Sequence, residues 1–170
     1  MQSMDNTYTT GDLQTWLARV VGALGETPHC TCDPKIDGVA VSLRYEQGML
    51  VSAVTRGDGE RGDEVIEQAK TIRSIPLRLR GEMPEVLEVR GEIFMPNTSF
   101  NAINIQREKD GEPLFANARN ATAGTLKSLD PSIVASRKLA FLAHGKGEVI
   151  WNDTPATWSK FVDAIRSFGI

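Results

Sequence analysis

The sequence predicts an α+β fold in which largely antiparallel sheets are flanked by helices. Short runs of alternating apolar residues are interspersed with stretches of helical periodicity, without the strict strand–helix alternation of a parallel sheet. A turn at Gln47 and Gly48 separates two apolar runs, which predicts a β-hairpin. At 170 residues, with 41% hydrophobic and 24% charged residues, the chain suits a single globular domain with a sizeable core.

The remaining elements follow from periodicity. The apolar residues of the first helix recur on one helical face, and those of the last helix do the same. In chain order we expect a helix within residues 9–25, the hairpin over 38–57, a loop over 57–64, a short helix over 64–72, a strand over 86–95, a helix over 97–112, a loop that becomes helical over 115–131, a strand over 138–145 and a helix over 154–170.

Capping residues set several of these boundaries. Thr10 is the expected N-cap of the first helix, and Gly25 its end. Asn97 is the expected cap of the helix that follows the strand at 86–95. The last helix is expected to begin at Thr154, with Pro155 in its first turn.

Composition limits the class of protein. No apolar run is long enough to span a bilayer, and no signal-peptide pattern is present. We therefore expect a cytoplasmic protein that does not bind a membrane. Cys30 and Cys32 are too close for a relaxed disulfide, which favours a reducing compartment. His29 and these cysteines lack a second cluster that would complete a four-ligand metal site. The net charge of −3 still allows a local basic face that binds phosphates.

A lysine between two aspartates opens the first strand, in the stretch CDPKIDG. On an extended chain Asp33, Lys35 and Asp37 would project from one side. One interpretation is a solvated strand start with a surface ion pair, which is worth little. The other is a lysine nucleophile whose flanking carboxylates position it or hold a metal.

Three further segments are unusual for a core. In TRGDGERGDE, glycines would let the backbone approach a phosphate and Arg56 could clamp it, although an ordinary hairpin loop would look similar. In LEVRGEIF, Glu88, Arg90 and Glu92 share one face of an apolar strand, so that face must meet water, a partner or a site. The segment FANARNATAGTLK opens a basic stretch, which is either a solvated face or a binding surface.

Taken together and in this order, these motifs resemble the nucleotidyltransferase core of NAD-dependent bacterial DNA ligases. The resemblance covers nearly the whole chain. It rests on SMDN, CDPKIDGVAVSLRYE, TRGDG, TIRSIPL, LEVRGEIFM, FANARNATAGTLKSLDP and the final FGI. It implies the fold of the catalytic core shared by DNA ligases and mRNA capping enzymes, incomplete at its C-terminal side. An ATP-using ligase or RNA-capping relative would share only the K-x-D-G element.

The resemblance also implies roles for individual residues. Lys35 would attack the α-phosphate of NAD and carry AMP, and Asp37 would orient the site. Asp33 stands where the family has a glutamate that contacts adenine. Arg56 would contact the nucleotide and Glu92 its ribose or a metal.

Further positions follow from the same resemblance. Ser3 and Met4 would lie beside the base. His144 stands where the family has an aromatic residue, often tyrosine, stacked on adenine. Arg119 and Lys127 would lie near the DNA backbone.

The implied activity is the sealing of DNA nicks during replication and repair, with NAD as AMP donor. The implied metal is Mg²⁺, held by Asp37 and Glu92. The implied partner is nicked double-stranded DNA, which the protein would bind through the DNA backbone as a monomer. We expect residues 1–170 to be a partial adenylation domain. The family's preceding nicotinamide-binding domain, its later lysine motifs and its oligonucleotide-binding-fold, zinc-finger and C-terminal domains are not found in this sequence. The alternative is a non-catalytic nucleotide- or DNA-binding remnant of a ligase.

Overall fold

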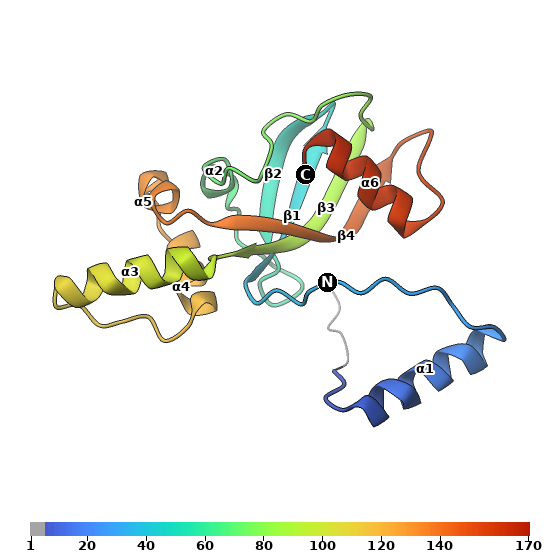
Figure 1. Cartoon of the computed structure of the whole chain (residues 1–170). Coiled ribbons are helices and arrows are strands. Elements are labelled where there is room, and N and C mark those ends of the chain that lie inside the picture. The colour runs from blue at the N-terminus through green and yellow to red at the C-terminus, as the bar shows by residue number, and fades with distance from the viewer. Residues whose placement is uncertain (1–5) are drawn as a thin grey trace. The chain divides into compact units, whose positions relative to one another are not determined.

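The computed structural model describes residues 6–170, which form two compact units (Figure 1). The first extends to Pro34 and the second comprises Lys35–Ile170. No helix within residues 6–170 combines the length and the apolar character needed to cross a membrane. The predicted roles of Ser3 and Met4 fall outside the described residues.

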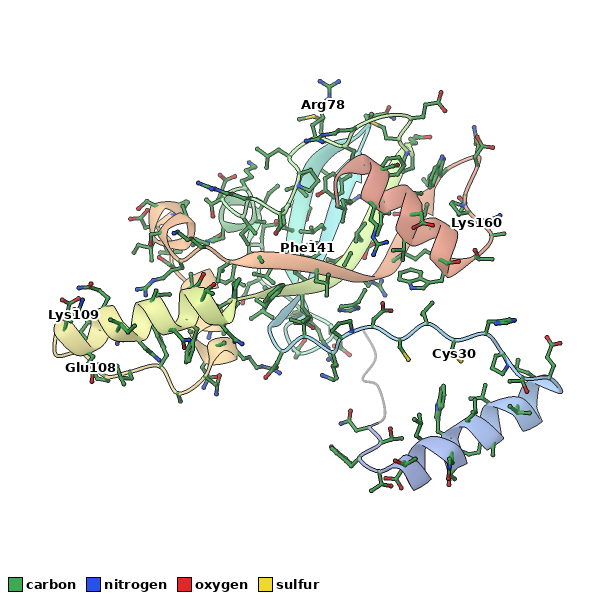
Figure 2. All side chains as sticks on the ribbon, viewed as in Figure 1. Cys30, Arg78, Glu108, Lys109, Phe141 and Lys160 are labelled. Atoms are coloured by element: carbon green, nitrogen blue, oxygen red, sulfur yellow. The ribbon has the colours of Figure 1, made fainter. Side chains whose placement is uncertain are left out.

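Over residues 6–34, the part of the first unit that the structure describes, there is one helix, α1 (Thr10–Leu24). Its N-cap is Thr9 and not the predicted Thr10, because Thr9 and Asp12 form a reciprocal capping box. Gly25, at φ 75°, ends the helix as predicted. The thiols of Cys30 (labelled in Figure 2) and Cys32 are free and exposed, as their spacing predicts.

The second unit is built on a four-stranded antiparallel sheet of order β2-β1-β3-β4, which confirms the mixed, antiparallel class. Gln47 and Gly48, with φ of 49° and 75°, make the tight turn of the predicted hairpin. The final strand is longer than the sequence indicates, because small and charged residues continue it past residue 145. The strands are β1 (Val39–Glu46), β2 (Met49–Thr55), β3 (Val86–Phe94) and β4 (Ala140–Ile150).

Five helices surround this sheet, and two of their caps differ from the prediction. The helix after β3 begins behind Pro96 without a side-chain cap, and not with Asn97 as cap. The last helix is capped by Thr157, because the Thr154 hydroxyl instead donates to the Trp151 carbonyl. The helices are α2 (Ile66–Ala69), α3 (Asn97–Lys109), α4 (Ala118–Leu126), α5 (Pro131–Ser136) and α6 (Trp158–Phe168).

One face of the sheet forms the hydrophobic core, and the other is polar. Val41, Leu43, Leu87 and Val89 are fully buried on the core face. Helix α6 adds three buried side chains to the same core, those of Phe161, Ile165 and Phe168. Most residues that alternate with the buried ones are polar and partly exposed, namely Ser42 and Arg44 on β1 and Glu88, Arg90 and Glu92 on β3. Polar side chains on this face are therefore accessible to solvent or to a ligand.

Candidate active site

The charged stripe predicted on the third strand lies on the polar face of the sheet. Glu88, Arg90 and Glu92 of β3 are partly exposed and alternate with buried residues. Glu92, near the end of the strand, lies opposite Ala40 of β1 and Leu142 of β4. Its side chain is only 20% exposed, so the carboxylate lies close to the surface of the sheet.

The environment of Glu92 shifts its ionisation. Burial raises the pKa of the Glu92 carboxyl above its usual value. His144, when it is protonated, and the charged Arg119 and Lys35 oppose this rise in the pKa, and the negative charge of Asp37 adds to it. His144, Arg119, Lys35 and Asp37 therefore lie within electrostatic range of Glu92, and we call these five residues the lysine cluster.

A β-bulge brings His144 to the cluster. Arg90 pairs with Gly145 and Gly91 with Ala143, so His144 is the extra residue on β4. Such a bulge redirects the side chain of the unpaired residue. The imidazole Nε2 of His144 lies 3.8 Å from the Glu92 carboxylate, and 39% of the side chain is exposed.

Lys35 and Asp37 lie ahead of β1, because the strand begins at Val39. The common orientation predicted for Asp33, Lys35 and Asp37 therefore concerns residues outside the strand, and it stays a prediction. The Asp37 carboxylate accepts a hydrogen bond from the Arg119 guanidinium at 3.0 Å. Arg119 lies in the first turn of α4, a helix that contacts both β1 and β3. This ion pair is largely exposed and ties the helix to the segment that carries the lysine.

The glycines of two motifs have steric causes. A Cβ on Gly38 would overlap the Ile93 carbonyl of β3, so only glycine lets the segment after Lys35 lie against that strand. A Cβ on Gly91 would overlap the Leu142 carbonyl and the Phe141 ring of β4. The glycines of K-x-D-G and R-G-E thus permit close backbone approach between the start of β1, β3 and β4.

Arg56 directly follows β2, at the end of the hairpin. Its backbone amide donates to the Ala40 carbonyl at 2.8 Å, and its side chain is partly buried. The loop after it is ordered by Asp58, whose carboxylate accepts from the amides of Glu60 and Arg61. The glycine-rich stretch therefore forms a closed turn beside the start of β1.

The comparisons with known proteins identify the family of the chain. The family model of the NAD-dependent DNA ligase adenylation domain matches residues 1–170. A DNA ligase of Methylobacterium sp. (strain 4-46) is 47% identical, over 100% of this chain and 21% of the relative. A DNA ligase of Geobacter metallireducens is also 47% identical, over 100% of this chain and 26% of the relative. A DNA ligase of Gloeobacter violaceus is 48% identical, over 89% of this chain and 23% of the relative.

The chain belongs to the NAD-dependent DNA ligase adenylation-domain family. This confirms the resemblance drawn from its motifs. The chain spans about a fifth to a quarter of the length of these curated relatives, which are 21%, 26% and 23% covered.

One polar network of this adenylation domain was not foreseen. Glu88 accepts hydrogen bonds from the Ser42 hydroxyl at 2.6 Å and from the Glu148 backbone amide at 3.3 Å. Burial opposes ionisation here, yet these bonds and Arg90 leave the pKa of Glu88 lowered. The Arg44 guanidinium binds the Glu148 carboxylate at 2.7 Å. These contacts join three strands, so only the alternation of charges along each strand could have indicated them.

Two other predicted positions are Asp33 and Lys127. Asp33 belongs to the first unit of the adenylation domain. Lys127 caps the C-terminal end of α4 and is exposed. Their predicted contacts with adenine and with DNA remain predictions.

The described residues suit a magnesium ion only in part. They contain no group of three or more histidine, cysteine or acidic side chains arranged to hold a metal. They do provide two carboxylates, Asp37 and Glu92, that act on each other beside Lys35. Mg²⁺ is commonly held by one or two carboxylates together with waters and substrate phosphates, so the pair fits that ion.

Proposed function

We propose that this chain is the adenylate-forming part of an NAD-dependent DNA ligase, with the fold of the nucleotidyltransferase core. One observation supports the proposal: Lys35, Asp37, Arg119 and His144 lie within electrostatic range of Glu92, which is on the polar face of the sheet. The family match and the DNA ligases among the relatives support it. The proposed overall task is nick sealing in replication and repair.

In the proposed first step, the Lys35 amine attacks the α-phosphorus of NAD. A nitrogen–phosphorus bond forms while the bond to nicotinamide mononucleotide breaks, and that group leaves with the electron pair. The amine must lose a proton to react, yet a nearby carboxylate favours its charged form. Arg119 neutralises part of the Asp37 charge through their ion pair. Arg119 thus favours the reactive amine, a role beyond the predicted contact with DNA.

The AMP would then leave Lys35. In the proposed second step a DNA 5′-phosphate oxygen attacks the phosphorus of the AMP, and the lysine nitrogen takes back its bonding electrons and a proton. A 3′-hydroxyl then attacks the activated 5′-phosphate and releases AMP, which seals the strand. The partners of the whole reaction are therefore NAD and nicked double-stranded DNA.

The remaining side chains would bind the nucleotide. His144 offers a flat ring for stacking on adenine, and its bulge turns it toward Glu92. Glu92 would accept hydrogen bonds from the ribose, and Arg56 would bind a phosphate through its planar guanidinium. We propose that Asp33, Ser3 and Met4 contact the base.

Asp37 and Glu92 would hold a magnesium ion. A bound Mg²⁺ would supply positive charge that stabilises the developing charge on the phosphate oxygens. Lys127 and Arg119 would meet the DNA backbone from α4.

The test is transfer of label from NAD. The chain is incubated with NAD labelled in its adenylate half, and both protein-bound label and released nicotinamide mononucleotide are measured. Lys35→Ala should abolish both, while Lys70→Ala, which removes an exposed lysine paired with Glu67 on the C-terminal side of α2, should retain both. Binding of NAD without any label on the protein would favour the alternative, a non-catalytic nucleotide-binding remnant. Labelling from ATP but not from NAD would contradict NAD dependence.

A further inference from the structure

The part of β4 around His144 contains few side chains that can fix its position along β3. Residues 143–148 read AHGKGE, and glycine has no side chain to select one face of the sheet. The register of a glycine-rich strand is weakly specified, and a slip of one residue moves every side chain to the opposite face. The orientation of His144 therefore depends on contacts outside this stretch.

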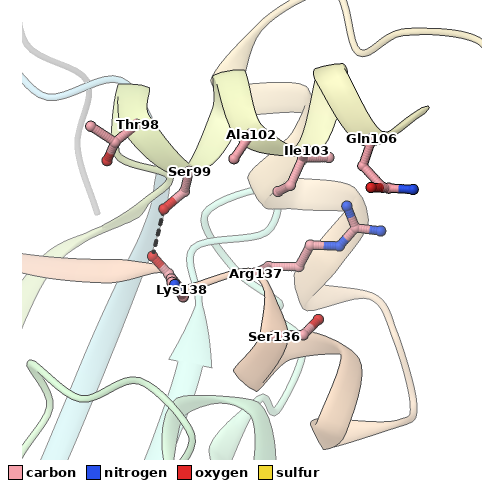
Figure 3. Close-up of a pocket in the computed structure, with 8 residues that line it drawn as sticks. All are labelled: Thr98, Ser99, Ala102, Ile103, Gln106, Ser136, Arg137 and Lys138. Carbon is pink, nitrogen blue, oxygen red and sulfur yellow. Dashed lines mark hydrogen bonds between the residues drawn. The ribbon is translucent and has the colours of Figure 1, made fainter. Parts of the chain in front are cut away.

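The beginning of β4 is held by residues of other elements. The Ser99 hydroxyl of α3 donates to the carbonyl of Lys138, shortly ahead of the strand, at 3.4 Å (Figure 3). The Phe141 amide donates to the Ser74 hydroxyl at 2.8 Å, and the Phe141 side chain is buried. These contacts secure the residues before His144 but not those after it.

A second bulge lies beyond His144. Over one stretch β4 advances by three residues while β3 advances by two, so β4 has a second extra residue at 147–148. Gly145 and Lys146 are the residues paired with β3 between the two bulges. Migration of the second extra residue toward His144 would change both pairs and disturb the bulge that orients the imidazole. The pairs on either side of the second bulge are Val89–Lys146 and Leu87–Val149.

Glu88 holds the second bulge in place. Glu148 is unpaired in the register of β3 and β4, and its backbone amide donates to the Glu88 carboxylate at 3.3 Å. The other oxygen of this carboxylate accepts the Ser42 hydroxyl at 2.6 Å and the Arg90 guanidinium at 3.3 Å. Because β1 and β3 thus fix the carboxylate, it marks one position along β4 as the place of the extra residue.

Steric exclusion favours the same register. A Cβ at residue 147 would overlap the Glu88 carboxylate, so only glycine fits at this point of β4. A slip of one residue in either direction would bring Lys146 or Glu148 to the place of Gly147. The Glu148 carboxylate, which binds Arg44 of β1 at 2.7 Å, would also lose its partner.

We propose that Glu88 is a positioning residue for adenine-nucleotide binding, because it fixes the register of β4 and thereby the orientation of His144. This inference rests on the proposed function, in which the imidazole stacks on adenine. Glu88 acts through β4 and not on the nucleotide, since its side chain is 21% exposed and both of its oxygens are occupied. Ser42 orients the carboxylate, and Gly147 leaves room for it.

The first measurement reads the register without any nucleotide. Nuclear Overhauser contacts between β3 and β4 are compared in the 170-residue chain and its variants. Glu88→Ala should lose the contact between Arg90 and Gly145, because nothing then holds the second bulge. Glu88→Gln should keep it, since its amide oxygen can still accept the Glu148 amide. Glu67→Ala, which removes an exposed, paired carboxylate from α2, is the matched control and should also keep it.

The second measurement is the affinity of the same proteins for AMP, by calorimetric titration. Glu88→Ala should weaken AMP binding about fivefold or more, the lower range for loss of a base–aromatic stack. Glu88→Gln and Glu67→Ala should bind AMP as the parent chain does. In the His144→Ala background, Glu88→Ala should have no further effect, because both changes remove the same contact. Gly147→Ala, which keeps Glu88 but crowds its carboxylate, should reproduce the loss.

Two results would overturn the proposal. One is an unchanged contact between Arg90 and Gly145 in both Glu88→Ala and Gly147→Ala. The other is a loss of AMP affinity on Glu88→Ala that persists in full in the His144→Ala background, since Glu88 would then act on the fold as a whole. An AMP affinity that does not change in His144→Ala contradicts the proposed stacking instead, and the strand contacts then decide alone whether Glu88 fixes the register.

Discussion

Glu92 is a partly buried carboxylate whose position is unfavourable for its charged form. Burial at the floor of the sheet disfavours its charged form, and the neighbouring cations only partly compensate. A carboxylate kept in such a position costs stability at neutral pH, which is expected of a residue retained for function.

The cost predicts a pH-dependent effect of Glu92→Gln. A carboxyl whose pKa is raised on folding stabilises the fold below its unfolded pKa, near 4.5, and loses that contribution as pH rises through the folded pKa. As pH rises from 4 to 7, the free energy of unfolding of the Gln variant should therefore increase relative to that of the parent chain. Urea unfolding at several pH values measures this. A gain that shrinks over the same range would show that Glu92 is stabilising when charged.

The sequence indicated which charged residues are candidates for the site. It did not indicate how they are arranged in space. The spacing of Lys35 and Asp37 and the alternation around Glu92 indicated charged side chains where a core was expected. The pair between Arg119 and Asp37 joins residues 82 positions apart, which no local pattern encodes. The bulge at His144 was equally invisible, because it depends on the register of two strands.

At the scale of elements, periodicity predicted the strands and most helices. The N-caps were less predictable, since Thr9, Thr10, Thr154 and Thr157 are chemically alike and hydrogen bonds decide among them. Helix α5 was missed because the Asp130–Pro131 pair indicated an end. In the structure Asp130 caps a new helix, with its carboxylate accepting from the Ser132 amide.

The approach of β1 to β3 gives a test at this scale. Gly38→Ala places a methyl group against the Ile93 carbonyl, so the free energy of unfolding should fall by about 1–3 kcal/mol. Gly124→Ala is the control, because nothing lies within 4 Å of its Cβ in α4. That change should stabilise by about 0.5–1 kcal/mol. Equal effects in denaturant unfolding would remove the steric explanation of the K-x-D-G glycine.

At the scale of the whole molecule, DNA binding should depend on the phosphate backbone. The basic residues of α4 suit phosphate oxygens, and nick sealing must accept any sequence. The net charge of −3 keeps such binding weak.

A salt titration with two nicked duplexes of unrelated sequence tests this expectation. Arg119→Gln with Lys127→Gln should weaken binding to both duplexes alike and reduce the slope of log K against log salt by roughly 1.8. Arg78→Gln with Lys160→Gln changes the net charge equally on other elements (Figure 2). Binding that favours one sequence, or an equal loss in both variants, would argue against α4 as the contact.

The most direct test of the central claim is the position of the AMP. The chain is incubated with NAD, digested, and its peptides are sequenced by tandem mass spectrometry. We predict a single AMP on Lys35, in the peptide that contains CDPKIDG. The adduct should be missing from Lys35→Arg, whose guanidinium stays protonated and cannot attack. AMP on another lysine, or an adduct that persists in Lys35→Arg, would contradict the assignment of Lys35 as the nucleophile.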